Sequence, residues 1–373
     1  MTILAGLRDG MRRVIGCILA FALIPGLTAC FGEPADPDKV QERIQVIAMD
    51  TAMFISTYGR RSTAAAYASE DMIRDLEAQL SRTEEDSEVS RLNAADGRPT
   101  EVGPDLAALL TAAEEYRADT GGAFDITVAP VVSAWGFTED SFRVPAQAEL
   151  ETLLEKVDGS AVRVERTVGG CTAALAPGQS ADLGGIAKGY AADKLADLFR
   201  EYEIPRAIAT LGGNVLAWGD RPDGTAWRVG VQDPARPDEQ NGFVGILNLK
   251  NSFAVTSGGY QRYFEEDGRT YHHIIDPATG YPADSDLTSV TVVAEVLPPD
   301  AEQLYGPGTM CDALSTALFV MGREQALNFW TSRKHAFDLV LVTKDGEIYV
   351  TGGIAEDFVF YEESGYAYPV LVK

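Results

Sequence analysis

The chain has 373 residues, of which 46% are hydrophobic, and this length and composition suit one large domain or two with ample buried core. Its 31 Lys and Arg residues against 56 Asp and Glu residues give a formal net charge of -25, and the sequence contains no local basic patch. Such a surface repels the phosphates of nucleic acid, so the charge argues against a nucleic-acid partner.

The first thirty residues differ from the rest. Arg12 and Arg13 precede the apolar run VIGCILAFALIPGL, which Pro25 interrupts, and LTAC then ends at Cys30. A basic start, a short apolar run and small residues before a cleavage point are typical of a secretory signal peptide, and the run is shorter than the ~20 residues of a membrane span. The LTAC ending resembles a bacterial lipoprotein box, which implies cleavage before Cys30 and a lipid on its thiol. An ordinary signal peptide that ends near a cysteine is the alternative.

These features predict a signal peptide over residues 1–29 and a Pro-containing tether over residues 30–43. We expect an exported protein that is lipid-anchored to the bacterial cell membrane, on the outer face of the cytoplasmic membrane or on the periplasmic side of the envelope. Of the cysteines beyond this region, Cys171 and Cys311 either pair or remain free thiols, and geometry decides which.

The remaining chain alternates helical and strand patterns. Residues 44–59 predict one strand, and Ser69 is a candidate cap for the helix that follows it. Helices are predicted at 68–82, 104–119, 147–157, within 181–199, at 310–322 and at 326–333. Strands are predicted at 206–211, 214–219, 226–232, 242–249, 252–257, 261–266, 270–276 and 287–295, with a closing hairpin of 338–343 and 347–353. Mixed helices and mostly sequential strands predict an α+β fold.

The stretch ADLGGIAKGYAADKLADLF begins at Ala181 and has the features of an anion site. Gly184 and Gly185 let the backbone approach a ligand closely, and the following helix start offers free N–H groups and a positive dipole end. Lys188 adds a full positive charge, so the stretch suits a phosphate. The alternative is a helix cap by Asp182 with the lysine in solvent. Further glycine pairs in LGGNVLAWG and TSGGYQRYF each predict a turn or bulge, and three such pairs in one chain indicate a site lined by backbone.

Two other stretches carry polar groups at informative spacing. Asp312 and Thr316 in CDALSTALF are four residues apart, hence on one helix face, where a hard cation such as Mg²⁺ would satisfy both oxygens. The alternative is a carboxylate that interacts with the helix dipole and a threonine bonded back to its own helix. His272 and His273, adjacent in a predicted strand, should point to opposite faces, so we expect one of them to face a site, and a histidine pair without a functional role is the alternative. In GGAFDITVAPVVSAWGF the aromatic residues form either core or one wall of a planar ligand site.

Six stretches together resemble, in order and spacing, the ApbE-like FAD:protein FMN transferases: GGAFDITVAPVVSAWGF, DLGGIAKGYAAD, LGGNVLAWG, TSGGYQRYF, HHIIDPATGYPA and CDALSTALFVMG. The similarity runs from about Ile44 to the C-terminus. It implies a single catalytic domain over residues 44–373 with an ApbE-like, T-fold-related mixed sheet core and flanking helices. It also implies Mg²⁺-dependent cleavage of the FAD pyrophosphate, attachment of FMN through a phosphoester to a threonine of a target protein, and release of AMP.

The resemblance carries roles to individual positions. His273 and Asp312 match catalytic positions, His273 as the acid–base catalyst. The metal contacts match Asp312, Thr316 and the backbone of Gly185. The FAD contacts match Met49, Ala123, Phe124, Asp125, Asp182, Lys188 and Ile275. The implied targets are FMN-carrying subunits of redox complexes or other exported flavoproteins.

The chain departs from the family pattern in three places. Thr83 stands in LSRTEEDSEVSRLN where many members have a tyrosine that stacks on FAD, and Gly185 stands where a threonine is frequent. Residues 296–311 form an insertion just before Asp312, which we expect to reshape the entrance to the metal site.

Two other functions fit the same residues. With water as acceptor the site would be an FAD pyrophosphatase that releases FMN and AMP. Without catalysis the protein would be a lipid-anchored flavin-binding protein, although mere binding needs neither Asp312 and Thr316 nor His273. A purely structural lipoprotein would leave all six motifs unexplained.

Overall fold

A computed structural model describes residues 40–138, 141–239, 242–300, 303–367 and 369–373. The predicted signal peptide and Cys30 therefore lie outside the described residues, as does all of the predicted tether before residue 40. Within the part of the chain that the structure describes, no helix is both long and apolar enough to cross a membrane.

The elements follow the order that the sequence patterns indicate. The helices are α1 (Ser62–Leu80), α2 (Glu88–Ala94), α3 (Pro104–Asp119), α4 (Ala129–Ala134), α5 (Gln147–Leu154), α6 (Ala187–Glu201), α7 (Pro307–Met321) and α8 (Arg323–Thr331). The strands are β1 (Gln41–Ala48), β2 (Thr51–Tyr58), β3 (Thr100–Val102), β4 (Arg163–Thr167), β5 (Gly170–Ala174), β6 (Arg206–Leu211), β7 (Asn214–Trp218), β8 (Trp227–Gln232), β9 (Phe243–Leu249), β10 (Ser252–Gly258), β11 (Tyr263–Glu266), β12 (Arg269–His272), β13 (Leu287–Glu295), β14 (Asp338–Thr343), β15 (Ile348–Thr351), β16 (Phe358–Phe360) and β17 (Val370–Val372).

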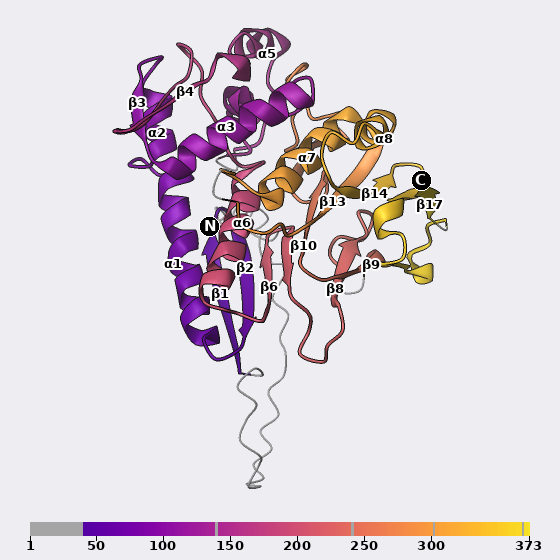
Figure 1. Cartoon of the computed structure of the whole chain (residues 1–373). Coiled ribbons are helices and arrows are strands. Elements are labelled where there is room, and N and C mark those ends of the chain that lie inside the picture. The colour runs from indigo at the N-terminus through magenta and orange to yellow at the C-terminus, as the bar shows by residue number, and fades with distance from the viewer. Residues whose placement is uncertain (1–39, 139–140, 240–241, 301–302, 368) are drawn as a thin grey trace, which may run out of the picture.

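A nine-stranded sheet in the order β1-β2-β6-β7-β10-β13-β14-β15-β17 forms the centre of the molecule. Its neighbours pair antiparallel except β15 and β17, which are parallel. Helices α1, α6, α7 and α8 pack on one face of this sheet, while the small sheet β16-β9-β8 packs on the other (Figure 1). Alternate residues of one strand divide between the two cores: Phe253 and Val255 of β10 face the helices, whereas Ala254 faces the small sheet.

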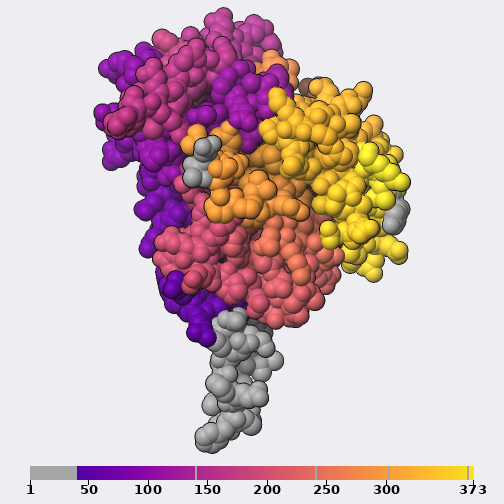
Figure 2. Space-filling view, viewed as in Figure 1, coloured from indigo at the N-terminus to yellow at the C-terminus, as the bar shows by residue number. Residues whose placement is uncertain are grey.

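A second part of the molecule lies beyond the strand ends at which the β1–β2 and β6–β7 turns occur. It consists of α2 to α5 and the small sheet β3-β5-β4, and α3 packs against α7 (Figure 1). In the space-filling view the orange segment around the start of α7 lies between this purple and magenta part and the pink part that contains α6 (Figure 2). The site described below forms where these parts meet. The fold is α+β, as the sequence predicts.

The predicted single strand over residues 44–59 is wrong. The structure has two antiparallel strands, β1 and β2, which reverse at Met49 and Asp50 with φ of 48° and 57°. Neither residue is glycine or proline, so the sequence lacks the usual sign of a turn. The backbone N–H of Met49 donates to the Glu77 side chain on α1 at 2.6 Å, a contact made by the folded chain that supports this unusual conformation.

Ser69 does not cap a helix. It lies buried within α1, which begins at Ser62, and its hydroxyl donates to the carbonyl oxygen of Ala65 at 2.6 Å. Helix α1 extends further toward its start than predicted because its alanine-rich first turns pack on β1 and β2. The predictions omitted α2 and the sheet β3-β5-β4, whose strands are short and largely polar. Cys171 and Cys311 are both free thiols.

Candidate active site

The glycine turn before α6 is built by its own aspartate. Asp182 accepts a hydrogen bond from the N–H of Gly184 at 2.8 Å through Oδ1, and its own N–H donates to the carbonyl oxygen of Ile126 at 2.8 Å. Lys188 is the second residue of α6, and its ammonium group donates to the carbonyl oxygen of Gly184 at 3.0 Å. One of the three ammonium donors is therefore used locally, and two are left for a ligand.

Helix α7 presents its polar pair to this turn. The Asp312 carboxylate is 4% exposed and accepts the N–H of Gly189 at 2.8 Å through Oδ2. A Cβ added to Gly185 would lie 3.5 Å from Thr316 Oγ1 and 3.2 Å from the Phe124 ring, so this glycine lies directly against both side chains. The structure thus places Thr316 against Gly185 and Asp312 against Gly189, one turn further along, and Asp312, Thr316 and Gly185 are the positions to which the family resemblance assigns metal contacts.

The oxygen donors here suit a magnesium ion. Ser257 of β10 adds a hydroxyl that lies 3.3 Å from Thr316 Oγ1 and 2.8 Å from Ser315 Oγ. Among the described residues, no three His, Cys, Asp or Glu side chains gather into a ready-made metal site. That composition fits Mg²⁺, which is commonly held by one or two carboxylates, waters and the phosphates of a substrate rather than by an all-protein cage.

His273 follows directly on β12 and adjoins the same region. Its backbone N–H donates to the carbonyl oxygen of Arg262, and its ring Nδ1 lies 3.1 Å from the same oxygen. A carbonyl only accepts, so Nδ1 carries the hydrogen and Nε2 keeps a free lone pair. His273 is only partly buried by surface area, but the surrounding protein desolvates the ring. This desolvation, together with the charges of His272, Arg262 and Lys188, lowers the pKa of His273 to about 4, although the hydrogen bond to the Arg262 carbonyl oxygen acts in the opposite direction. The ring is therefore neutral at pH 7.

The two histidines meet different neighbours. The His272 ring meets Phe319 of α7 edge-on with centroids 5.4 Å apart, while the His273 ring lies 6.4 Å from Phe137. Ile275 is buried, bridges to Pro282, and packs in the apolar cluster that contains Phe137. The loop after His273 is thereby fixed against the segment that follows α4.

The remaining predicted FAD contacts have mixed surroundings. Phe124 lies against Gly185, and Ala123 packs beside it on the main core. The Asp125 carboxylate is engaged by the protein through both oxygens, because it accepts from Thr127 N and Oγ1 at 2.8 and 2.6 Å and from the N–H of Gly159 at 2.8 Å. Met49 lies at the β1–β2 turn. A role for Asp125 would therefore fall to its backbone rather than to its carboxylate.

Arg82 is a site residue that the sequence reasoning missed. Its guanidinium donates to Asp182 Oδ2 at 2.8 Å and also to Ser133 Oγ, so it ties the segment after α1 to the glycine turn and to α4. In LSRTEEDSEVSRLN the departure from the family pattern is at Thr83, whose hydroxyl lies 2.9 Å from the hydroxyl of Ser81. The arginine next to it was the informative signal, since a cation in so acidic a chain needs an anionic partner or ligand.

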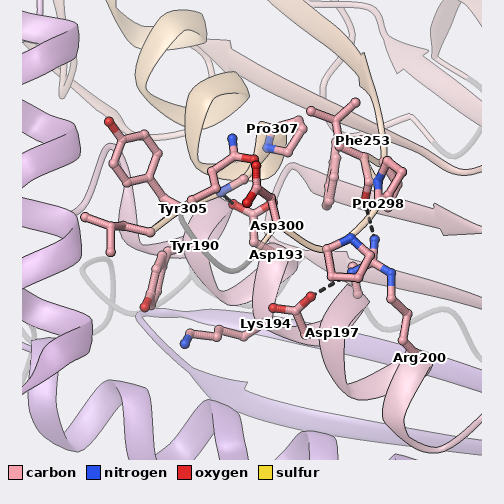
Figure 3. Close-up of a pocket in the computed structure, with 17 residues that line it drawn as sticks. Tyr190, Asp193, Lys194, Asp197, Arg200, Phe253, Pro298, Asp300, Tyr305 and Pro307 are labelled. Carbon is pink, nitrogen blue, oxygen red and sulfur yellow. Dashed lines mark hydrogen bonds and ion pairs between the residues drawn. The ribbon is translucent and has the colours of Figure 1, made fainter.

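The insertion before α7 does not lie over the glycine turn. Residues 296–300 and 303–307 line a cavity of about 160 Å³ against α6, around Asp193 and Arg200 (Figure 3). Asp193 is two helical turns beyond Gly185, or about 12 Å along the axis at 1.5 Å per residue. The insertion therefore shapes the start of α7 rather than the glycine turn.

Comparisons with known proteins agree with this geometry. The ApbE family matches residues 49–341. The FAD:protein FMN transferase of Haemophilus influenzae is 30% identical over 90% of this chain and 95% of its own length, and that of Treponema pallidum is 33% identical over 84% and 85%. The crystal structure of the ApbE protein from Thermotoga maritima is similar with a TM-score of 0.73 and 31% identity, covering 83% of this chain and 96% of that one. The flavin transferase ApbE from Vibrio cholerae gives a TM-score of 0.72 at 26% identity, with 85% and 99% covered.

Proposed function

This chain belongs to the ApbE family and is an FAD:protein FMN transferase, and from this premise we propose that it moves FMN onto a threonine hydroxyl of a target protein and releases AMP. One observation carries the proposal furthest. Asp312 and Thr316 of α7 face the Gly185 turn of α6, and His273 lies close enough to Lys188 for the lysine charge to lower its pKa. The groups that we propose to bind phosphate, to hold a cation and to act as the base thus lie in one region.

The glycine turn and Lys188 would bind the FAD pyrophosphate. The N–H groups of Ile186 and Ala187 donate to the carbonyl oxygen of Leu183, so the two unused donors of the Lys188 ammonium, which lies against Gly184, are the main groups that would bind the phosphates. Arg82 holds Asp182 in place through its ion pair and offsets the negative charge that this carboxylate would direct at the substrate. These residues would orient the pyrophosphate so that the phosphorus of the FMN half is exposed to the acceptor.

His273 would remove the proton from the acceptor. Its Nε2 takes the hydrogen of the threonine hydroxyl while the hydroxyl oxygen forms a bond to the phosphorus of the FMN half. The bond from that phosphorus to the bridging oxygen breaks, and AMP leaves with this oxygen and the electron pair. Because Nδ1 is held by the carbonyl oxygen of Arg262, the ring keeps the orientation that leaves Nε2 free.

Asp312, Thr316 and the backbone of Gly185 would hold Mg²⁺, and the Ser257 hydroxyl lies near enough to support Thr316. When bound, the ion supplies Lewis-acid polarisation of the pyrophosphate and neutralises charge on the leaving AMP. The buried Asp312 carboxylate has only the Gly189 N–H as a hydrogen-bond donor among the described residues, and such a group gains from a cation partner.

The test combines the protein without residues 1–29, FAD, Mg²⁺ and a target domain from an exported FMN-carrying redox subunit. We expect a fluorescent target band on a denaturing gel that EDTA abolishes, with one AMP released per FMN attached. His273→Gln should lower the rate by about 100-fold or more, since general-base catalysis contributes 10²–10⁴-fold. Asp312→Asn should lower it by about 1000-fold by weakening the cation site.

The matched controls are His335→Gln and Glu324→Gln, which change the third histidine and an exposed carboxylate on α8. Both should transfer FMN at the wild-type rate. Free FMN and AMP without a labelled target would instead identify the pyrophosphatase. Bound FAD with neither product would leave the flavin-binding protein.

We also propose that the mature protein is exported and anchored by a lipid on Cys30, because the LTAC sequence follows a short apolar run. The full-length chain expressed in a bacterium should partition into the detergent phase of Triton X-114. Cys30→Ala should move it to the aqueous phase. Equal partitioning of the two proteins would favour an ordinary signal peptide.

A further inference from the structure

Asp193 of α6 holds the first turn of α7. Its Oδ1 accepts the N–H of Gly308 at 2.8 Å, and its Oδ2 accepts the N–H of Gly306 at 3.0 Å and both the N–H and the hydroxyl of Thr309 at 2.8 and 2.6 Å. These are the N–H groups that a helix start leaves unpaired, and here a side chain from another helix satisfies them. Figure 3 shows Asp193 beside Pro307, on the side of α6 that faces the start of α7.

The two helices cross closely enough for this short side chain to reach. A Cβ on Gly189 would lie 2.6 Å from the Asp312 Cβ and in hard overlap with the carbonyl oxygen of Gly308. A Cβ on Gly308 would in turn lie 2.7 Å from the carbonyl oxygen of Gly189 and 2.7 Å from Asp193 Oδ1. Glycine at both positions therefore permits backbone contact between α6 and α7.

Asp193 has no cation to offset its charge. The adjacent Lys194 pairs with Asp105 at 2.9 Å, and no ion pair reaches Asp193 within the described ranges. The side chain lines the cavity of Figure 3, yet desolvation raises the pKa of Asp193 to about 6 in spite of its hydrogen bonds to Thr309, Gly308 and Gly306. Burying a carboxylate without a cationic partner costs free energy that an apolar contact between the helices would not. We therefore infer that Asp193 does more than pack α6 against α7.

The helix that Asp193 holds is the one that carries the proposed cation ligands. Asp312 follows Thr309 by one turn, and Thr316 follows by two, so their positions depend on where α7 starts. The helix that supplies Asp193 is the one that begins at the Gly185 turn and Lys188. The four hydrogen bonds thus connect α6, which begins at the proposed phosphate site, with α7, which carries the proposed cation ligands. They do so two turns along α6 from the Gly185 turn.

We propose that Asp193 is a positioning residue for the divalent cation. By holding the start of α7 against α6, it fixes where Asp312 and Thr316 lie relative to Gly185 and Lys188. This inference rests on the proposed function, because the cation belongs to that function. A helix cap that only stabilised the fold would predict a lower melting temperature and unchanged cation affinity in the folded protein.

The test measures Mn²⁺ binding by electron paramagnetic resonance, with and without FAD, at a temperature where circular dichroism shows every variant folded. Asp193→Asn keeps the size of the side chain but turns an NH₂ group toward N–H donors. We expect the Mn²⁺ dissociation constant to rise by about tenfold, equivalent to the loss of one or two charge-assisted hydrogen bonds. Transfer at low Mg²⁺ should fall accordingly and recover at high Mg²⁺.

Two further variants separate positioning from folding. Thr309→Val removes one donor to Asp193 and should raise the Mn²⁺ dissociation constant in the same direction but less, whereas Thr309→Ser keeps the hydroxyl and should restore it. Asp197→Asn is the matched control, because Asp197 lies one turn further along α6, its side chain is 63% exposed, and among the described residues it pairs only with Arg200 (Figure 3). It should bind Mn²⁺ as the wild type does.

The outcomes discriminate clearly. An unchanged Mn²⁺ dissociation constant in folded Asp193→Asn, beside an active wild type, would overturn the positioning role and leave the transferase in place. Absence of both Mn²⁺ binding and FMN transfer in the wild type would overturn the proposed function and this inference with it. A tenfold loss of affinity in Asp193→Asn that Thr309→Ser does not share supports the inference.

Discussion

His273 owes its proposed role to its surroundings. An exposed histidine is about half protonated near pH 6.5 and would be a poor base just below neutrality. Desolvation and nearby positive charges lower the pKa of His273 to about 4, which leaves the lone pair on Nε2 unprotonated throughout the neutral range and makes the ring a weaker base than an exposed imidazole. The hydrogen bond from Nδ1 to the carbonyl oxygen of Arg262 fixes which nitrogen is free.

The same shift makes a prediction for stability. Between pH 6.5 and about 4 the unfolded chain binds a proton at this histidine that the folded chain does not, so the His273 contribution rises with pH and is lost as the pH falls through this window. Asp193 acts in the opposite sense, because its pKa is raised from 3.8 to about 6, and the two contributions partly cancel in the wild type.

Comparing the unfolding free energies of wild type and His273→Gln isolates the His273 contribution, because Asp193 is present in both proteins. We expect the difference in unfolding free energy to grow in favour of the wild type by up to about 3 kcal/mol from pH 4 to pH 6.5, at ~1.4 kcal/mol per pKa unit. Urea unfolding at half-unit pH steps measures it. Parallel stability curves for the two proteins would show that His273 titrates normally.

Replacing Arg82 tests how charge in the site affects FAD binding, with little expected loss of unfolding free energy. Its pair with Asp182 is 18% and 23% exposed, so we expect Arg82→Gln to lower the unfolding free energy by no more than about 1 kcal/mol. The KM for FAD should rise by about tenfold, because Asp182 loses its partner and directs its charge at the pyrophosphate. Arg74→Gln removes an exposed pair with Glu70 on α1 and should leave the KM unchanged. Equal KM values for all three proteins would assign Arg82 a purely structural role.

At the scale of elements, the crossing of α6 and α7 organises the site. The N–H of Gly189 donates to Asp312 although the residues are 123 positions apart, and Asp193 reaches Gly308 across 115. The helices meet through glycine, so their separation is set by backbone rather than by side chains that adjust.

Gly189→Ala should therefore cost more than most additions of one methyl group. The new Cβ would overlap the carbonyl oxygen of Gly308 and the Asp312 Cβ, both parts of a neighbouring helix. We expect a loss of about 2 kcal/mol in unfolding free energy, within the ~1–3 kcal/mol typical of an overfilled core, even though alanine favours helix more than glycine does. Asp197→Ala on the exposed side of α6 is the control and should change stability little. A stabilised Gly189→Ala protein would show that α7 moves aside easily.

At the scale of the whole molecule, the net charge of -25 opposes the approach of an anionic substrate. Lys188 and Arg82 act only at short range, so the long-range field should hinder FAD most at low salt. We expect the KM for FAD to fall about twofold or more between ~0.01 and ~0.15 M NaCl at constant free Mg²⁺, since the Debye length shortens from about 30 to about 8 Å. Sucrose at matched osmolarity is the control. A KM that rises with salt would mean that the local cations dominate the field.

Regular elements were predictable where the local pattern was strong. The strands β6, β13 and β14 and the helix α3 have the predicted bounds, because each has a clear apolar period or a proline at its first turn. The β1–β2 turn was missed because Met49 and Asp50 adopt a left-handed conformation that only the contact to Glu77 and the folded sheet support. A local sequence pattern does not indicate a contact with a residue that is distant in the chain.

The sequence by itself determined the α+β class, the family and the short motifs that contain the proposed phosphate-binding residues, the proposed cation ligands and the histidine pair, because each of these depends on residues close together in the chain. Only the tertiary structure decided which partners those residues have. It placed Arg82 on Asp182 across 100 positions, Asp193 on the start of α7, and His273 in surroundings that lower its pKa to about 4. Burial and contact between distant segments set these properties, and both arise only when the chain has folded.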